Sequence, residues 1–326
     1  MEKKFYGRFA PTPSGFLHLG NVFCSLLAWL FAKSRHGGIV LRIEDLDSAR
    51  CPRANADALA RDLEWLGLTW DSGAYACADD SLYFQSNRSC IYEAFFAKLQ
   101  ARQLLYPCFC GRNELHAASA PHSSDGRVIY PGTCRGLTSE EIAAKSRQRS
   151  PAYRISTAAA PERITFTDGL LGKQSCDLRK DCGDFILRRS DGVYAYQLAV
   201  VIDDALMGID QVVRGNDLLT STPQQLFLYE LLELPAPEFI HIPLLTAADG
   251  RRLAKRDGDL EIGVLRRRFG SPEPVIGLLA HLAGQLPRPE PLRPEDLLNI
   301  FDPTKIPHGS IVVPDLTRQA QISMLH

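Results

Sequence analysis

Residues 8–21, RFAPTPSGFLHLGN, place a Pro- and Gly-rich turn and one histidine directly before a long apolar run, VFCSLLAWLFA. A helix that begins after Gly20 offers free backbone N–H groups and the positive end of its dipole, and both attract phosphate. His18 can donate a hydrogen bond to a phosphate oxygen, and Gly20 lets the backbone approach a base closely. The segment therefore predicts a nucleotide site, with a plain connecting loop as the alternative.

Two common phosphate-binding sequences, G-x-x-x-x-G-K-[ST] and G-x-G-x-x-G, are absent, so a nucleotide would be held in another way. Lys255, in the Gly-flanked stretch TAADGRRLAKRDGD, could neutralise a triphosphate whose charge grows in the transition state. A histidine such as His18, taken alone, is more often a structural residue than a phosphate ligand. The prediction therefore depends on the full order Pro-x-Pro-Ser-Gly-x-x-His-x-Gly before an apolar helix.

Three of the nine cysteines form a cluster in the sequence. Cys108 and Cys110 are separated by one residue, and Cys134 follows later. A tight pair with a distant third thiolate predicts a tetrahedral zinc site, and three unliganded thiols are the alternative. Residue chemistry leaves the fourth ligand open, because His116 and His122 lie between the cysteines. The remaining thiols are expected to be reduced and to have no special role: Cys24, Cys51, Cys77, Cys90, Cys176 and Cys182.

The composition is that of an ordinary globular protein, with 326 residues and 45% hydrophobic side chains. A net charge of −1 excludes a globally basic nucleic-acid binder, although local arginine clusters such as 266–268 could form a basic patch. There is neither an apolar run long enough to span a bilayer nor an apolar leader at the start. We therefore expect a cytoplasmic protein without membrane association.

Strands and helices alternate along the chain. The expected elements are a strand at 5–10, a buried helix at 22–33 capped by Asn21, a strand at 37–47, helices at 54–68 and 87–103, and a strand at 104–110. Periodicity is lost over 108–150, which indicates an insertion. Beyond it we expect a hairpin at 185–199, a helix at 199–207, a strand at 210–218, a helix that Thr222 caps, a strand at 238–246 and helices after 260.

This order indicates a parallel sheet with helices on its faces, split into one half before 108 and another after 184. In such sheets ligands bind beyond the carboxyl ends of the strands. Three polar stretches follow predicted strands: PTPSGFLHLGN, EDLD and TAADGRRLAKRDGD. We therefore expect these stretches to converge on one face of the molecule.

The stretch RFAPTPSGFLHLGN followed by LRIEDLD resembles the catalytic domain of glutamyl-tRNA synthetases, class I enzymes with a HIGH signature, and RRLAKRD stands where that family has KMSKS. The stretches YPCFC, VIYPGTCRGL and DFILRRSDGVYAYQLAVVIDDALMGIDQVVRGNDLL narrow the resemblance to the short members of the family, which attach glutamate to the queuosine base of tRNA(Asp). The resemblance covers roughly residues 5–315. It implies an α/β fold, a Rossmann-like parallel sheet split by a zinc-binding insertion, with a short, mostly helical C-terminal region.

The resemblance also implies boundaries and residue roles. The expected segments are 1–107 and 184–259 for the two halves of the catalytic domain, 108–183 for the zinc-binding insertion and 260–326 for a stem-contact region with a Pro-rich tail. The glutamate pocket would be formed by Arg8, Ala10, Thr12, Glu44, Tyr196 and Arg214. ATP would be bound by His18, Gly20, Asn21, Arg252 and Lys255, of which His18, Asn21 and Lys255 are the expected catalytic residues. Tyr130 becomes the preferred fourth zinc ligand, beside Cys108, Cys110 and Cys134.

Two departures from the family pattern occur: Asn21 replaces the second histidine of HIGH, and residues 252–256 read RLAKR, with Ala254 where the family has a serine. The implied reaction forms glutamyl-adenylate from glutamate and ATP with Mg²⁺, and the glutamyl group then passes to a tRNA. Too few residues follow position 260 for a large helical anticodon-binding region, which favours queuosine-bearing tRNA(Asp) as the partner of an expected monomer. The alternatives are a minimal synthetase that charges tRNA(Glu), and a catalytically silent tRNA-binding zinc protein.

Overall fold

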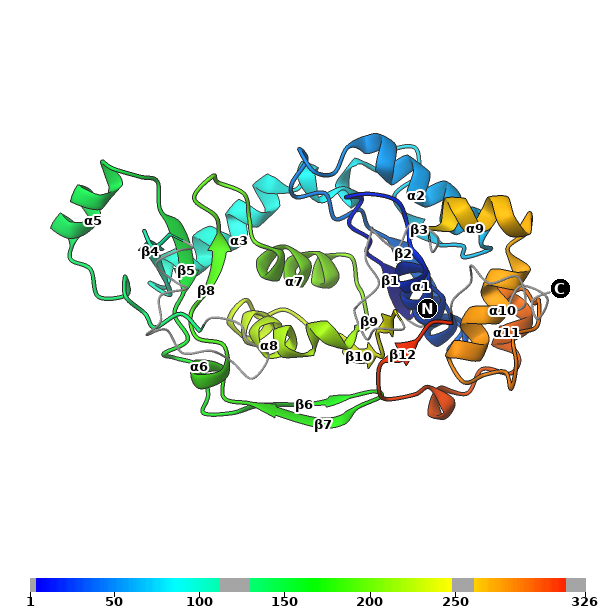
Figure 1. Ribbon diagram of the computed structural model, residues 1–326. Helices are drawn as coiled ribbons and strands as arrows, with labels where there is room; N and C mark the ends of the chain where they lie inside the picture. Colours follow the sequence, from blue (N-terminus) through cyan, green and yellow to red (C-terminus); the bar gives the residue numbers. More distant parts are fainter. Residues whose placement is uncertain (1–3, 112–128, 248–260, 315–326) are drawn as a thin grey trace.

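The computed structural model describes residues 4–111, 129–247 and 261–314. Figure 1 shows an elongated molecule, with β4 (Leu105–Cys108) and α5 (Ser139–Ser146) at one end and α10 (Glu273–Leu282) at the other. Between these ends, strands from both halves of the chain run beside one buried helix. This central region positions the candidate site.

The central strands are parallel. β1 (Tyr6–Phe9) pairs with β2 (Gly38–Leu41), and β2 pairs with the short β3 (Ser72–Gly73). β9 (Gln211–Gly215) and β10 (Glu238–Ile242) form a second parallel pair. The backbone N–H of Asp210 donates to the carbonyl of Tyr6 at 2.8 Å, which joins β9 to the β1 side. The predicted split parallel sheet is confirmed.

Helix α1 (Leu19–Lys33) packs against β1 and β9 and is almost entirely buried. It begins at Leu19 rather than at residue 22, and His18 is its N-cap, so the prediction that Asn21 caps this helix is wrong. Asn21 lies in the first turn, where its Oδ1 accepts a hydrogen bond from the backbone N–H of His18 at 3.3 Å. A side chain three residues into a helix can satisfy the cap backbone in this way, which explains the earlier start.

The segment after β4 (Leu105–Cys108) forms a separate antiparallel sheet. β4 pairs with β5 (Ala152–Ile155), and β5 pairs with β8 (Phe185–Arg188). The hairpin of β6 (Ile164–Asp168) and β7 (Gly172–Cys176) runs along the molecule beneath α8 and β10 in Figure 1. Its tip reaches β10, because the backbone N–H of Gly169 donates to the carbonyl of Phe239 at 2.8 Å. Two short helices complete this part: α5 (Ser139–Ser146) and α6 (Leu178–Asp181).

The hairpin predicted over 185–199 forms only around its turn. β8 ends at Arg188, an antiparallel bridge joins Arg188 to Tyr194, and the backbone N–H of Ala195 donates to the carbonyl of Leu187 at 2.8 Å. Helix α7 (Tyr196–Leu206) then begins, three residues earlier than predicted. The helix buries every side chain from Leu198 to Asp204. Helical burial therefore overrides the local hairpin pattern.

Two further predictions need correction. The expected strand over 238–246 is divided, because Pro243 has no backbone N–H to continue it. The short β11 (Leu245–Thr246) pairs instead with β12 (Ile311–Val312) from the end of the described chain. Helix α8 (Thr222–Leu231) has Ser221 as its N-cap, and the hydroxyl of Thr222, the predicted cap, contacts Arg214.

The remaining helices cover the sheet and form the other end of the molecule. They are α2 (Arg53–Trp65), α3 (Ser89–Ala101), α9 (Ile262–Phe269), α10 (Glu273–Leu282) and α11 (Pro294–Leu298), with 3-10 turns at Ser81–Tyr83, Gln85–Asn87, Asn216–Ser221 and Pro303–Lys305. One apolar cluster surrounds α1 and extends to α10, and another lies between α3, α7 and α8. Within the ranges that the structure describes, no helix combines the length and apolar character needed to cross a membrane.

Candidate active site

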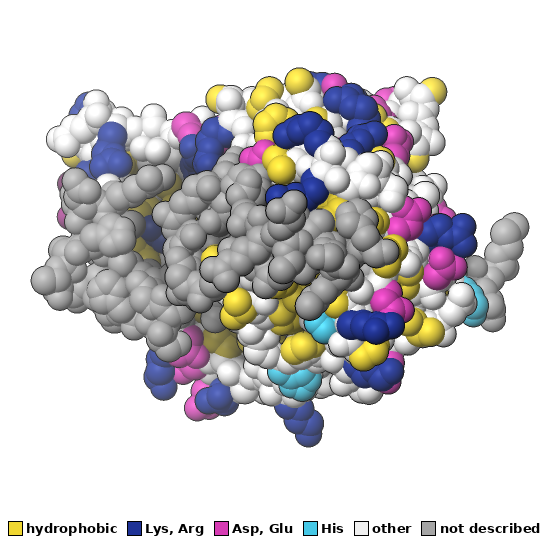
Figure 2. All heavy atoms as spheres, turned by 45° about the vertical axis from the view of Figure 1, so that its right-hand side comes forward, with side chains coloured by type: hydrophobic (Ala, Val, Ile, Leu, Met, Phe, Trp, Pro, Cys, Tyr) yellow, Lys and Arg dark blue, Asp and Glu magenta, His cyan; other side chains and the backbone are white. Residues whose placement is uncertain are grey.

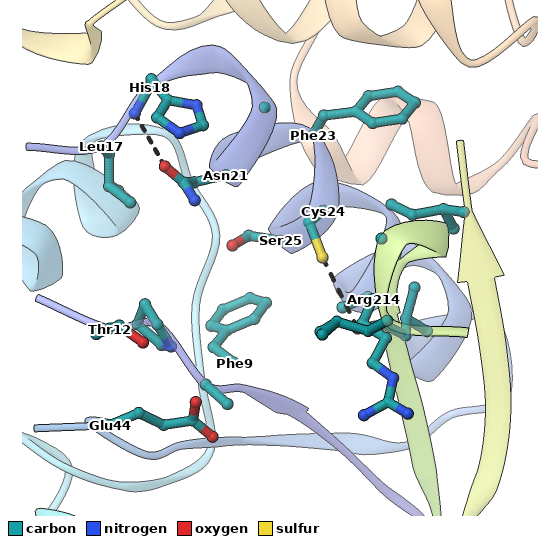
Figure 3. A pocket seen from close by; sticks show the side chains of 18 of the residues that line it. Phe9, Thr12, Leu17, His18, Asn21, Phe23, Cys24, Ser25, Glu44 and Arg214 are labelled. Carbon is teal, nitrogen blue, oxygen red and sulfur yellow. Dashed lines mark hydrogen bonds between the residues drawn. The ribbon is translucent and has the colours of Figure 1, made fainter. Parts of the chain in front are cut away.

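A cavity of about 530 Å³ lies at the carboxyl ends of the parallel strands. Nine of the residues predicted from the sequence line it: Arg8, Ala10, Thr12, His18, Gly20, Asn21, Glu44, Tyr196 and Arg214. Three of the labelled side chains in Figure 3 come from different parts of the chain, since Glu44 follows β2, Arg214 stands on β9 and His18 caps α1. Arg252 and Lys255, the other two predicted site residues, lie outside the described residues.

One wall of the cavity is a buried network of charged groups. The Nε of Arg8 lies 3.0 Å from Oδ1 of Asp204, and the guanidinium of Arg42 reaches the same carboxylate at 2.7 Å. Arg42 also donates to Oε1 of Glu44 at 3.1 Å. Asp203, next to Asp204 on α7, accepts hydrogen bonds from Arg88 at 2.6 Å and from other neighbours. The pairing fixes Arg8 and Glu44 at the cavity wall, because each contacts a partner that is itself held.

The sequence prediction missed Arg42, Asp203 and Asp204. All three are almost completely buried, and none of them lines the cavity. A signal for them existed, because a charged residue inside an apolar strand or helix has to be paired when it is buried. Arg42 interrupts the apolar run IVLRI, and the two aspartates interrupt AVVIDDAL.

The opposite wall carries Arg214, which is 4% exposed. Its Nε donates to Nε2 of His241 at 3.0 Å, and one terminal nitrogen donates to the Thr222 hydroxyl at 2.8 Å. Within the described part of the chain no salt bridge to Arg214 occurs, whereas Arg8 is paired with Asp204. The acceptors of Arg214 are thus neutral groups, and the acid on this side of the cavity lining is Asp217.

Burial shifts the titration of the groups around the cavity. It raises the pKa of Glu44, although Arg42 and Arg8 oppose that rise. Burial also raises the pKa of Tyr196, with a smaller contribution from Glu44, and it lowers the pKa of Arg214. A bound cation beside Glu44 and a bound anion beside Arg214 would each relieve the desolvation of these side chains. The cavity is therefore suited to a ligand that carries both charges.

The cavity mouth is formed by the turn before α1 and by the start of that helix. Thr12, His18, Gly20 and Asn21 line it. The N-terminal turn of a helix has free backbone N–H groups, which attract phosphate oxygens. A side-chain carbon on Gly20 would stand 3.2 Å from the His18 ring, so glycine leaves room for that ring. His18 also forms a β-bridge with Glu261, the first described residue after 260.

The three clustered cysteines lie together at the far end of the molecule. The sulfurs of Cys108, Cys110 and Cys134 are all within 4.8 Å of one another, and those of Cys110 and Cys134 are 3.6 Å apart. The hydroxyl oxygen of Tyr130 lies 3.5 Å from the sulfur of Cys108 and 3.7 Å from that of Cys110. Zinc–sulfur bonds of about 2.3 Å in a tetrahedron separate the sulfurs by about 3.8 Å. The donor set therefore fits a zinc ion, and His116 and His122 lie outside the described residues.

The surroundings of the cluster hold its residues in place. Arg154 donates to the sulfur of Cys108 at 3.2 Å, and its guanidinium stacks on the ring of Tyr130 at 3.9 Å. Its other end donates to the backbone carbonyl of Asp184 at 2.8 Å. A nearby positive charge favours thiolate over thiol, which is the form that binds metal.

Comparison with known proteins identifies the family of the chain. Residues 4–288 match the family model for the catalytic domain of class I tRNA synthetases (E and Q). The chain is 49% identical to a glutamyl-Q tRNA(Asp) synthetase of Symbiobacterium thermophilum, over 94% of this chain and 95% of that protein. It is 45% identical to one of Nitratidesulfovibrio vulgaris, over 94% and 95% of the two chains.

Among solved structures, the fold is similar to a glutamate–tRNA synthetase of Elizabethkingia anophelis, with a TM-score of 0.78 and 28% identity. The match covers 96% of this chain and 68% of that one. The expected α/β fold is thereby confirmed. The chain belongs to the class I tRNA synthetases for glutamate and glutamine, a family of ligases, and within them to the family of the glutamyl-Q tRNA(Asp) synthetases.

Proposed function

We propose that this protein activates L-glutamate with ATP and transfers the glutamyl group to the queuosine base of tRNA(Asp). The observation that carries the proposal is the charge arrangement of the cavity. Glutamate has two carboxylates and one ammonium, and the charged side chains that line the cavity include two arginines, Arg8 and Arg214, and two acids, Glu44 and Asp217. Arginine binds carboxylates through paired N–H groups, and Glu44 would bind the α-ammonium. The names of the relatives support the choice of tRNA.

The proposed reaction has two steps. An oxygen of the α-carboxylate of glutamate attacks the α-phosphorus of ATP, and the bond to the leaving pyrophosphate breaks. A hydroxyl of the tRNA then attacks the carbonyl carbon of the glutamyl-adenylate, loses its proton and releases AMP. No protein nucleophile is needed, so the residues act by positioning the reactants and by neutralising phosphate charge.

ATP would lie at the cavity mouth, against His18, Gly20, Asn21 and the first turn of α1. Arg252 and Lys255 would contact the triphosphate from the KMSKS-like segment, where their positive charges match its negative charge. Both flanks of that segment support this assignment, because Leu245 lines the cavity and Glu261 pairs with His18. Class I synthetases use ATP with Mg²⁺, which would neutralise part of the phosphate charge when it is bound.

The role of His18 predicts a specific defect. Replacing His18 by Ala should slow glutamyl-adenylate formation at least several-fold, because one hydrogen bond to a phosphate is lost, while the melting temperature changes little. Glutamate-dependent ATP–pyrophosphate exchange measures this step. A matched control is His308→Ala on the C-terminal segment, outside the residues that line the cavity. Unchanged exchange in His18→Ala would remove His18 from the proposed phosphate site.

Zinc would be a structural ion, held by Cys108, Cys110, Tyr130 and Cys134. Four protein ligands fill a tetrahedral shell and leave no position for a substrate. The ligands come from β4 and from the segment before α5, and none of them lines the cavity. In this proposal the ion stabilises the insertion, residues 108–183, which would contact the tRNA.

The tRNA requires a positively charged surface, which must be local because the whole chain carries a net charge of −1. Figure 2 shows Lys and Arg side chains gathered along the upper part of one face, with only a few acidic side chains among them. Helix α9 supplies three consecutive arginines, and Arg266 stacks over Trp65 of α2. These features support a polyanion as partner, and the transfer assay below identifies which tRNA it is.

The deciding experiment measures transfer of labelled glutamate to two purified RNAs, queuosine-containing tRNA(Asp) and tRNA(Glu). We expect label on tRNA(Asp) alone, and no label when the same tRNA lacks queuosine. Label on tRNA(Glu) alone would support the second candidate, a minimal glutamyl-tRNA synthetase, which the similarity to the solved glutamate–tRNA synthetase favours. Absence of both transfer and glutamate-dependent pyrophosphate exchange would leave only a tRNA-binding protein.

A further inference from the structure

Arg214 and His241 stand side by side on neighbouring parallel strands. They are register partners in the β9–β10 pair, so both side chains point to the same face of the sheet. The Nε of Arg214 is 3.0 Å from Nε2 of His241. Since an arginine nitrogen can only donate, Nε2 of His241 must carry a lone pair rather than a proton. This contact therefore requires a neutral His241 with its proton on Nδ1.

A buried carboxylate imposes that form of His241. Oδ2 of Asp168 lies 2.6 Å from Nδ1 of His241, and both side chains are completely shielded from solvent. The backbone N–H groups of Leu170 and Leu171 donate to Oδ1 of the same carboxylate at 3.0 and 2.9 Å. Although burial opposes the charge of Asp168, these hydrogen bonds and the one from His241 lower its pKa below the ordinary value. Burial lowers the pKa of His241, which keeps the ring neutral.

The other hydrogen bonds of Arg214 do not use all of its guanidinium nitrogens. The Thr222 hydroxyl accepts from one terminal nitrogen at 2.8 Å and lies 3.1 Å from Nε2 of His241. The other terminal nitrogen, Nη1, is buried and makes no hydrogen bond of ordinary geometry within the described ranges. Figure 3 shows the guanidinium extending from β9 on the side of the cavity across from Glu44. Neutral acceptors thus hold the guanidinium, and neither of them carries a charge that would pair with it.

We propose that Asp168 and His241 are a positioning pair that orients Arg214 for a carboxylate of the substrate and keeps its charge available for that carboxylate. The inference rests on the proposed function for the identity of the substrate. An aspartate in the place of His241 would pair with Arg214 and weaken its attraction for the ligand. A neutral acceptor avoids that loss, and a cation held by neutral acceptors discriminates a carboxylate from the uncharged amide of glutamine.

Asp168 belongs to the insertion, so the Asp168–His241 pair connects the insertion with the cavity. Asp168 is the last residue of β6, and the β6–β7 hairpin lies in the segment that separates the two halves of the catalytic domain. The hairpin tip is pinned to β10 by Asp168 and by the backbone of Gly169. The insertion therefore contributes to glutamate selection through a buried hydrogen-bond chain, although none of its described residues lines the cavity.

The test compares Asp168→Asn with the intact protein in glutamate-dependent ATP–pyrophosphate exchange. Asn has the same shape as Asp, but its amide can donate to Nδ1 of His241, which moves the proton of the ring to Nε2. The N–H at Nε2 would then face the Nε–H of Arg214, so that two donors oppose each other and the hydrogen bond is lost. We expect the KM for glutamate to rise at least about tenfold while the KM for ATP stays within about twofold. The preference for glutamate over glutamine in kcat/KM should fall as well. The matched control is Glu162→Gln, an exposed carboxylate just before β6.

Two variants of His241 separate positioning from simple packing. His241→Phe removes the contacts of the ring with Asp168 and with Arg214. His241→Gln retains an oxygen that can accept a hydrogen bond from Arg214. The Gln variant should therefore bind glutamate more tightly than the Phe variant. Thermal unfolding shows whether each variant is folded. An unchanged KM for glutamate in folded Asp168→Asn would overturn the positioning role while leaving the proposed function intact. If the intact protein neither catalyses exchange nor binds glutamate in calorimetry, both proposals are wrong.

Discussion

Replacing Arg214 by Gln should nearly abolish glutamate activation. The substrate carboxylate would lose a buried charged partner, a loss of about 2–5 kcal/mol, which corresponds to a decrease of roughly 30- to several-thousand-fold in kcat/KM. The kcat/KM of Arg214→Lys for glutamate should lie between those of the intact protein and Arg214→Gln, because lysine retains the charge but not the planar pair of donors. The measurement is glutamate-dependent ATP–pyrophosphate exchange with glutamate and ATP varied separately.

We expect the Arg214→Gln substitution to change the kinetic constants for glutamate and not those for ATP. Because Arg214 stands on β9 and the proposed ATP contacts lie at the start of α1, the KM for ATP should change little. Arg163→Gln, an exposed arginine just before β6, controls for the loss of an arginine. Near-normal kcat/KM for glutamate in Arg214→Gln would show that another group binds the carboxylate.

Removal of the metal site should separate the two steps of the reaction. The purified protein is expected to contain about one zinc per chain, and Cys134→Ala should lose it. Structural zinc contributes about 10–16 kcal/mol to the folding of small zinc-binding peptides, so the segment around β4 should unfold locally. Transfer to tRNA should then be lost, while glutamate-dependent pyrophosphate exchange continues, because no residue of the cluster lines the cavity.

Metal analysis of variants also identifies the fourth ligand. Tyr130→Phe should lower zinc affinity if the hydroxyl 3.5 Å from the sulfur of Cys108 is a ligand. If His116→Ala or His122→Ala lowers it instead, the assignment of Tyr130 is wrong. Cys90→Ala, an exposed thiol on α3, is the matched control. Full zinc content in Cys134→Ala would contradict the metal site itself.

Charge, more than secondary structure, limited what could be predicted about the site. The predicted residues Arg8, Glu44 and Arg214 line one cavity, because each lies near the carboxyl end of a parallel strand or just beyond it, and such ends meet at one edge of the sheet. Their supporting partners were missed. The apolar run around Asp204 indicates that this side chain must be paired, but neither Asp204 nor His241 indicates its partner, since Asp204 is 196 positions from Arg8 and His241 is 27 from Arg214. Only the packing of α7 and β10 against β1 and β9 creates those pairs.

The sequence alone determined those features of the protein that depend on residues close together in the chain and on the order of the strands. The apolar run after Gly20 required a buried helix, the strand order required a parallel sheet, and the turn with His18 required a polar site at its edge. Tertiary structure decided where local signals compete: it made His18 the cap of α1, started α7 at Tyr196 and turned Thr222 toward Arg214. It also decided the electrostatics of the site, because the charge that a buried arginine offers to a ligand depends on which distant side chains fold against it.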